Sequence, residues 1–373
     1  MRPANILHLG VKEFRSLLRD PIMLVLIVYA FSVAIYTAAT AMPESLHKAP
    51  IAIVDEDRSL LSQRIADAFY PPLFMPPVHI SQAEMDARMD AGLDTFAIDI
   101  PPQFQKDVLA GRPPTVQLNV DATRVSQAFT GSSYIQTIVT GEVNAFVQGQ
   151  RTASTPAVDL ALRMRFNPTG DKSWFGSVME IVNSVTMLSI VLTGAALIRE
   201  REHGTVEHLL VMPVTPFEIM SSKVWAMGVV VLVAAAVSLR LVVQGLLAVP
   251  IEGSIALFLA GTALHLFATT SIGIFLATVA RSMPQFGLLL LLVLLPLQIL
   301  SGGVTPRESM PELVQFIMLA APTTHFVKLS QAILYRGAGF LVVWPQFVAL
   351  TAIGATLFAL SLARFRKTLA AMA

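Results

Sequence analysis

The chain has 373 residues, of which 54% are hydrophobic and only 14% are charged. Soluble domains usually carry about a quarter charged residues, so this composition excludes an ordinary soluble domain and predicts a membrane protein. A net charge of +1 argues against a nucleic-acid-binding protein, whose affinity rests on neutralising phosphates, and the absence of cysteine excludes a disulfide framework.

The first 20 residues predict an amphipathic helix. Apolar side chains fall largely on one side of residues 6–19, with Lys12, Arg15 and Arg19 elsewhere. Such a helix suits the membrane surface, although a solvated lead-in helix is an equal alternative. Residues 21–42 follow as the first membrane span, because this stretch contains no charged residue and is about long enough to cross a hydrocarbon core.

Residues 43–173 have a different character and predict an α/β domain. Hydrophobic stretches shorten to strand length and alternate with helical patterns. We expect strands at 50–55, 95–100 and 116–121, and helices at 59–70, 81–92, 101–110 and 123–150. This alternation is typical of an α/β fold.

Residues 174–367 predict five further spans. They cover 174–198, 224–249, 254–280, 283–300 and a last span within 340–363. The stretch 301–339 is too interrupted by Pro and Gly to cross cleanly, so we expect a re-entrant or surface segment there. Residues 368–373 form a tail. The fold class is therefore an α-helical polytopic membrane protein with six spans and an inserted α/β domain.

Four of the polar residues inside the predicted spans could have a functional role. Glu180 and Asn183 either reach the headgroups or line a transport pathway, and we weigh these alternatives equally. For Arg240 we favour a side chain that reaches back to the membrane surface. For His265 we favour a hydrogen-bonding residue that faces the bundle interior.

Basic residues in the short segments set the orientation, because they gather on the cytoplasmic side of a membrane. One side holds Arg2, Lys12, Arg15, Arg19, Arg199, Arg201, Lys223, Arg281, Arg364, Arg366 and Lys367. The other side holds only Arg307, Lys328 and Arg336. We therefore expect both termini and the loop at 199–223 to be cytoplasmic, and residues 43–173 and 301–339 to be extracytoplasmic.

The loop at 199–223 contains the densest run of charge in the chain. Thr205 can cap a helix in which Val206, Leu209 and Leu210 form an apolar stripe, and Pro213 ends that helix. The pattern predicts a short amphipathic helix that docks a cytoplasmic partner. The alternative is a solvated loop that only sets orientation.

Two further patterns lie in the same loop. Thr215-Pro216-Phe217-Glu218 fits a capping box with Pro at the first helical position, which predicts the start of the next helix. His203, Glu207 and His208 lie close together, but their spacing matches no zinc motif and we expect no metal there.

The chain lacks the motifs that would make it an enzyme. It contains no GxxxxGK[ST] phosphate-binding loop and no GxSxG elbow. We therefore expect no ATP hydrolysis by the chain itself, and a membrane protein with a docking helix but no motor implies a separate motor subunit.

Four runs of residues resemble one known family over essentially the full length of the chain. They are residues 198–213 (IREREHGTVEHLLVMP), 321–337 (APTTHFVKLSQAILYRG), 96–104 (FAIDIPPQF) and 121–123 (DAT). The sequence resembles the ABC-2 type transport permeases with a large periplasmic domain. The ExGTxE core of the first run is the most specific of these signals.

The resemblance implies a permease subunit of an ATP-binding-cassette exporter in the bacterial inner membrane. Residues 1–20 would be the elbow helix, and the protein would form a homodimer or pair with a sister permease. ABC ATPase subunits would bind the ATP, with no cofactor on this chain, and a periplasmic membrane-fusion protein is a further possible partner. The ATPase-coupling residues would be Glu202, Gly204, Thr205, Glu207, Leu209, Leu210 and Pro213. The resemblance implies efflux of a small molecule or amphiphile, as in multidrug export, and assigns no role to Arg240 or His265.

Two other functions stay open. A membrane receptor or sensor would bind its ligand with the outer domain. A proton-driven transporter would use Glu180, Arg240 and His265, but it predicts an internal two-fold repeat that the hydropathy does not show.

Overall fold

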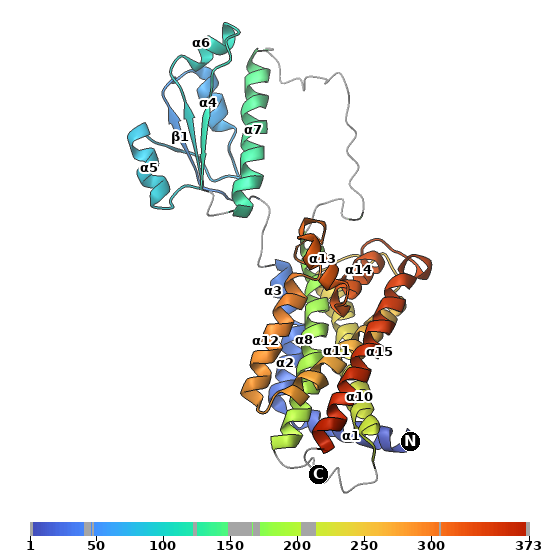
Figure 1. Cartoon of the computed structure of the whole chain (residues 1–373). Coiled ribbons are helices and arrows are strands. Elements are labelled where there is room, and N and C mark those ends of the chain that lie inside the picture. Colours follow the sequence, from blue (N-terminus) through green and yellow to red (C-terminus); the bar gives the residue numbers. More distant parts are fainter. Residues whose placement is uncertain are drawn as a thin grey trace. The chain divides into compact units, whose positions relative to one another are not determined.

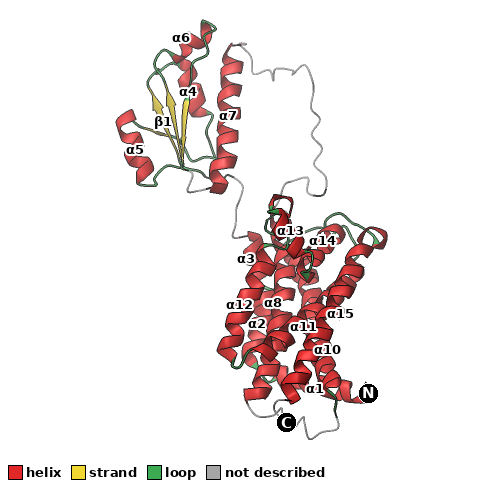
Figure 2. Ribbon diagram, viewed as in Figure 1, coloured by secondary structure: helices red, strands yellow, loops and turns green. Residues whose placement is uncertain are grey.

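The computed structural model describes residues 3–40, 46, 48–121, 125–147, 166, 172–202, 214–305 and 307–370, with the side chains of 125–130, 172, 369 and 370 left out. The chain divides into two compact units. One unit joins Met1–Ala41 to Met164–Ala373, and the other is Met42–Arg163. The first unit consists of helices, and the second contains both strands and helices (Figures 1 and 2).

The first unit is a helical bundle. Its helices include α1 (Pro3–Leu18), α2 (Pro21–Phe31), α3 (Val33–Thr40), α8 (Lys172–Glu202), α10 (Pro216–Ser238), α11 (Ile255–Val279), α12 (Met283–Ile299) and α15 (Phe340–Ala370). Five stretches of the described residues are long and apolar enough to cross a membrane: Pro21–Thr40, Ser173–Glu202, Pro216–Leu246, Ile255–Val279 and Phe340–Thr368. The helix α12 is apolar but shorter. The protein is therefore a polytopic helical membrane protein.

The helices α8 and α11 occupy the centre of the bundle. Of the most apolar part of α8, 83% of residues are buried, against 17% for α2–α3 and for α15. Between α8 and α11, Ser189 donates to Thr269 at 2.6 Å. A Cβ on Gly273 would lie 2.5 Å from the carbonyl oxygen of Ile190. Because Gly273 has no side chain, the backbones of α8 and α11 can lie close together, as small residues allow in membrane helices.

His265 of α11 contacts both α8 and a third helix. Its Nε2 is 2.9 Å from the Thr186 hydroxyl on α8, and its ring stacks on Phe326 of α14 (Pro322–Leu334) with centroids 4.2 Å apart. The side chain is completely buried. The prediction that His265 faces the bundle interior is confirmed.

Arg240 lies in a different environment. The helix α10 continues as a π-helix, η1 (Leu239–Leu246), and Arg240 is exposed on it. The stretch expected as re-entrant contains η2 (Arg307–Ser309), α13 (Glu312–Met318) and α14. These short elements lie at the end of the bundle opposite α1 (Figure 1).

The second unit is built on a four-stranded sheet in the order β2-β1-β3-β4. The strands are β1 (Ile51–Asp55), β2 (Val78–His79), β3 (Phe96–Ile100) and β4 (Gln117–Val120). The strand β1 pairs in parallel with β2 and β3, and β4 closes the other edge antiparallel to β3. The expected strands at 50–55, 95–100 and 116–121 are all present, and the structure adds the short β2.

Helices cover both faces of this sheet. They are α4 (Leu60–Asp67), α5 (Gln82–Asp90), α6 (Phe104–Leu109) and α7 (Val125–Val147). Ile51 and Ile53 belong to a core shared with α4 and α7, while Ala52 and Val54 pack with Met85 of α5. This alternation follows from the period of two along a strand, and the burial of β1 on both faces is typical of a parallel sheet.

Candidate functional site at the end of helix α8

The helix α8 ends in four consecutive charged residues, and each of them binds a different part of the bundle. Arg199 forms an ion pair with Asp20, at the junction of α1 and α2. Glu200 accepts from Lys12 of α1 at 2.6 Å and lies 2.8 Å from Lys223 of α10. These two residues therefore tie the end of α8 to three other helices.

The next two residues bind the ends of α11 and α12. One guanidinium nitrogen of Arg201 donates to the carbonyl oxygens of Ala277 and Ala280, each at 2.8 Å. Glu202 accepts from the backbone amide of Met283 at 2.9 Å. The last carbonyls and first amides of a helix lack partners inside it, so opposite charges are favourable at both places. The end of α8 thus caps one helix at its C-terminus and the next at its N-terminus.

Lys223 is the centre of a buried charge cluster. Its side chain is 2% exposed and lies 2.8 Å from Oε1 of Glu13 and 2.8 Å from Oε2 of Glu200. Lys12 completes the cluster from its solvent side, 2.6 Å from Glu200. Buried charges are tolerated when they are paired in this way, and removing one partner leaves the other uncompensated.

The helix α1 is packed on α10 rather than merely adjacent to it. A Cβ on Gly10 would lie 2.0 Å from Cζ2 of Trp225, so only glycine allows the ring to lie against the backbone of α1. The Trp225 indole donates to the carbonyl oxygen of Ile6 at 3.2 Å, and Phe14 meets the same ring edge-on at 5.4 Å. The contacts fix α1 to the start of a membrane-crossing helix.

Asp20 has two roles at the corner between α1 and α2. Its carboxylate caps α2 by accepting from the Met23 amide at 3.2 Å, and it pairs with Arg199. Burial acts to raise the pKa of Asp20, but the Met23 amide and the Arg199 guanidinium outweigh burial and hold that pKa below its ordinary value. The carboxylate is therefore stabilised in its charged form.

After residues 203–213, which lie outside the described residues, the chain re-enters the bundle at a capped helix start. Thr215 accepts from the amide of Glu218 at 3.3 Å, and the Glu218 carboxylate accepts from the amide of Thr215 at 2.8 Å. Pro216 occupies the first helical position. The predicted capping box is confirmed, and the helices on both sides of the loop are anchored in the bundle.

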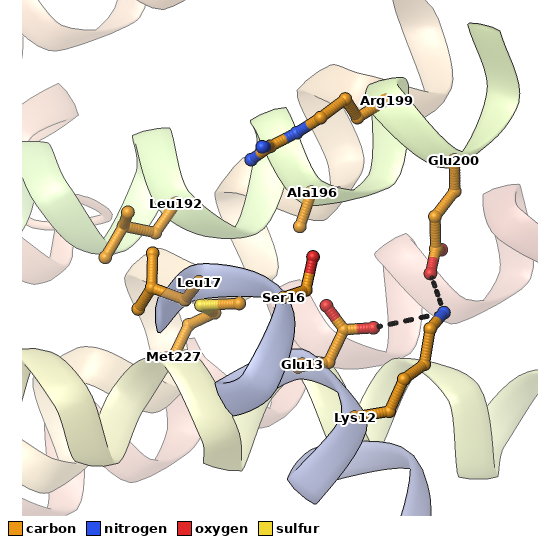
Figure 3. Close-up of a pocket in the computed structure, with 9 residues that line it drawn as sticks. All are labelled: Lys12, Glu13, Ser16, Leu17, Leu192, Ala196, Arg199, Glu200 and Met227. Carbon is orange, nitrogen blue, oxygen red and sulfur yellow. Dashed lines mark hydrogen bonds and ion pairs between the residues drawn. The ribbon is translucent and has the colours of Figure 1, made fainter. Parts of the chain in front are cut away.

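A pocket of about 330 Å³ opens beside the charge cluster (Figure 3). Its lining comes from α1, α8 and α10: Lys12, Glu13, Ser16, Leu17, Leu192, Ala196, Arg199, Glu200 and Met227. In Figure 3, Arg199 and Lys12 lie on opposite sides of the pocket, with Ser16 and Glu13 between them. The pocket therefore has an apolar floor and a charged rim.

Most of the predicted coupling residues lie outside the described residues. Only Glu202 is placed, and it caps α12. Those outside are Gly204, Thr205, Glu207, Leu209, Leu210 and Pro213, together with His203 and His208. Within the ranges that the structure describes, no group of three or more His, Cys, Asp or Glu side chains is arranged to hold a metal.

The predicted pathway residues lie near the other end of α8. The Asn183 amide is 3.5 Å from Oε2 of Glu180, and both side chains are partly buried. Among the placed side chains, no hydrogen bond or ion pair joins either of them to Arg240 or His265. The structure therefore brings Glu180 and Asn183 together.

The sequence interpretation missed the charge cluster and the contact between α1 and α10. The sequence pattern uses Lys12 and Lys223 only as orientation signals and does not single out Glu13. The sequence does place charges of opposite sign next to three different spans, and this signal could have indicated ion pairs between them. The pairing itself joins residues as far as 210 positions apart, which no local pattern specifies.

Known proteins resemble this chain over nearly its whole length. The profile of the family described as "ABC-2 family transporter protein" matches residues 21–363. The "Inner membrane transport permease YhhJ" of Escherichia coli (strain K12) is 66% identical over 369 residues, which cover 99% of each chain. The "Probable multidrug ABC transporter permease YbhR" of the same organism is 25% identical over 359 residues, covering 95% of this chain and 96% of the relative.

These similarities confirm the family resemblance of the sequence. Together with the five apolar helices, they indicate a multi-pass inner-membrane location. The family match covers α2 to α15 and therefore both units of the chain. The chain belongs to the ABC-2 family of transporter proteins.

Proposed function

We propose that this chain is the permease subunit of an ATP-binding-cassette exporter, which couples ATP hydrolysis by a separate ATPase subunit to export of a small molecule or amphiphile. The observation that carries the proposal is the set of contacts made by Arg199–Glu202. These residues lead directly into the loop at 203–213, and they bind α1, the start of α2, α10, α11 and α12. A displacement of the loop would reach all of these helices at once.

The mechanism follows from these contacts. The ATPase would bind the loop through the apolar stripe of Leu209 and Leu210, with Gly204, Thr205, Glu207 and Pro213 shaping the docked helix. When ATP brings two ATPase subunits together, the loop would move. Because Glu200 and Lys223 join the helices on both sides of the loop, α8 and α10 would move as one body and change the packing of the outer helices.

The topology of the proposal has six crossings. The helix α12 has 17 residues, about 25 Å at 1.5 Å per residue, and we assign it as a crossing beside the five longer ones. The helix α1 and the C-terminal end of α15 lie at the same end of the bundle, while the C-terminal end of α3 lies at the opposite end (Figure 1). Both termini and the loop at 203–213 would be cytoplasmic, and the α/β unit Met42–Arg163 would be extracytoplasmic.

The partners follow from the family and from what the chain lacks. The ATP would be bound by ABC ATPase subunits, with no cofactor on this chain. A second copy or a sister permease would complete the transmembrane part, and a periplasmic membrane-fusion protein would extend it. A relative bears the name "Probable multidrug ABC transporter permease", which supports efflux of amphiphilic compounds.

The experiment that tests this function is co-purification of the ATPase. Full-length tagged protein carrying Leu209→Asp and Leu210→Asp is extracted from native membranes, and bound ATPase is measured by mass spectrometry and ATP hydrolysis. A matched control carries Leu313→Asp and Ile317→Asp on α13, where both apolar side chains are exposed at the other end of the bundle. We expect loss of the ATPase in the first variant and retention in the control. Equal amounts of ATPase in both would contradict the proposal.

A further inference from the structure

The pocket beside the charge cluster is bounded on one side by α1, a helix whose side-chain pattern suits the membrane interface. The helix α1 presents exposed Leu7 and Leu18 next to exposed Arg15, and the exposed Arg19 follows directly after it, which is the pattern of a helix lying in the membrane interface. The pocket opens between this helix and two helices that are long enough to cross the membrane. A lipid at the membrane surface can therefore reach it by lateral movement.

The lining of the pocket divides into a polar rim and an apolar floor. Leu17, Leu192, Ala196 and Met227 are all buried to at least nine-tenths of their surface and form the floor. The rim carries the side chains of Lys12, Glu13, Ser16, Arg199 and Glu200. Such a site suits an amphiphile whose headgroup meets the rim while the start of its acyl chain covers the floor.

The charges of the rim, taken together with their ion-pair partners Asp20 and Lys223 outside the pocket lining, are balanced, and this balance favours one class of headgroup. Three cations meet three anions in direct ion pairs: Lys12 with Glu200, Arg199 with Asp20, and Lys223 with Glu13 and Glu200. A purely anionic headgroup would have to compete with Glu200 and Asp20 for the same cations. A headgroup that carries both signs adds no net charge to this balanced set, so its phosphate can share the cations while its ammonium shares the carboxylates.

We propose that this pocket binds a zwitterionic glycerophospholipid whose headgroup carries a primary ammonium. Its phosphate accepts hydrogen bonds from Lys12, Ser16 and Arg199. Its ammonium donates to the carboxylates of Glu13 and Glu200, which a trimethylated ammonium cannot do because it has no N–H. The bound lipid bridges α1 and α8 beside the cluster that leads to the loop, so it holds together the elements that would move during transport.

Native mass spectrometry on the purified full-length protein tests the proposal. The protein in mild detergent is titrated with phosphatidylethanolamine, phosphatidylcholine and phosphatidylglycerol that carry the same acyl chains. We expect the ethanolamine lipid to bind more tightly than either of the others by roughly tenfold, the effect of one charge-assisted hydrogen bond. Equal binding of the ethanolamine and choline lipids, or tightest binding of the glycerol lipid, would overturn the assignment.

Two pairs of variants locate the binding. Ser16→Asp adds a carboxylate where the phosphate would lie, and His8→Asp adds the same group to the same helix outside the pocket; both positions are exposed. Ala196→Phe fills the floor, and Leu360→Phe adds bulk at an exposed position of α15. We expect weaker binding of the ethanolamine lipid only in the first member of each pair. If Ser16→Asp and His8→Asp bind the ethanolamine lipid equally well, the lipid is a general annular lipid and the proposed site is refuted. This outcome does not depend on whether the ATPase binds the protein.

Discussion

Lys223 and Glu13, 210 positions apart in the chain, form a buried ion pair with 2.8 Å between Nζ and Oε1. The pair fastens the N-terminal helix α1 to α10, the helix that follows the loop at 203–213. Because Glu200 at the end of α8 shares the same ammonium, three segments of the chain meet at one charge. The helix α1 is thus part of the bundle's structure.

Replacing the shared cation is expected to destabilise the bundle strongly. Lys223→Met leaves two carboxylates buried with one half-exposed lysine, and breaking a buried pair in this way costs about 3–5 kcal/mol. Thermal unfolding of the detergent-solubilised protein measures the effect. The control Lys367→Met removes an exposed lysine from α15 and should leave the melting temperature unchanged.

Thermal unfolding of a triple variant tests whether the loss of stability in Lys223→Met comes from uncompensated charge. Glu13→Gln and Glu200→Gln combined with Lys223→Met remove the uncompensated charges, so most of the lost stability should return. If the triple variant were as unstable as Lys223→Met alone, the loss would come from packing and not from charge.

Gly10 tests the contact between α1 and α10. Gly10→Ala places a Cβ within 2.0 Å of the Trp225 ring, and overpacking of this kind costs about 1–3 kcal/mol. Gly287→Ala on α12 is the control, because its Cβ meets no atom within 4 Å and alanine favours a helix by about 1 kcal/mol. We expect a lower melting temperature and altered tryptophan fluorescence for Gly10→Ala only. Similar behaviour of the two variants would argue against the close packing of α1.

Most elements of the fold were predictable because they have strong local patterns. The strands at 51–55 and 96–100 are short apolar runs, and the spans are long ones. The capping box at Thr215 and Glu218 is a motif of four residues, and the structure confirms it. The sequence also indicated that His265 faces inward, since a lone imidazole in a span needs a partner.

The candidate site was less predictable, because its contacts are long-range. Asp20 and Arg199 are 179 positions apart, and Arg201 caps the end of α11, 76 to 79 positions further along the chain. Charge patterns show that these residues lie near membrane surfaces but not which helices are neighbours. The break of the first span at Ser32 and the π-helix around Arg240 also depend on packing rather than on composition.

Asp20 predicts a dependence of stability on pH. Because the pKa of Asp20 is lowered in the folded protein, its contribution to stability is complete above the ordinary pKa of an aspartate in an unfolded chain. That contribution is lost as the pH falls through the lower pKa of the folded protein. We compare melting temperatures of the wild type and Asp20→Asn from pH 7 downward. The variant should be less stable at pH 7, and the difference should shrink once the pH falls below about 4. A difference that stays constant over this range would show that the Asp20 carboxylate is not stabilised by Met23 and Arg199.

The orientation of the chain in the membrane can be tested by cysteine labelling without background from native thiols, because the chain contains no cysteine. Thr205→Cys places one thiol in the loop between α8 and α10, and Gln63→Cys places one at an exposed position of α4 in the other unit. A membrane-impermeant maleimide added to cells with a permeabilised outer membrane should label Gln63→Cys at once. It should label Thr205→Cys only after the inner membrane is opened, since the loop would face the side where the ATPase binds. Labelling of Thr205→Cys in cells with an intact inner membrane would place the loop on the periplasmic side. No cytoplasmic motor could then reach the side chains next to Arg199–Glu202, and the proposed coupling would fail.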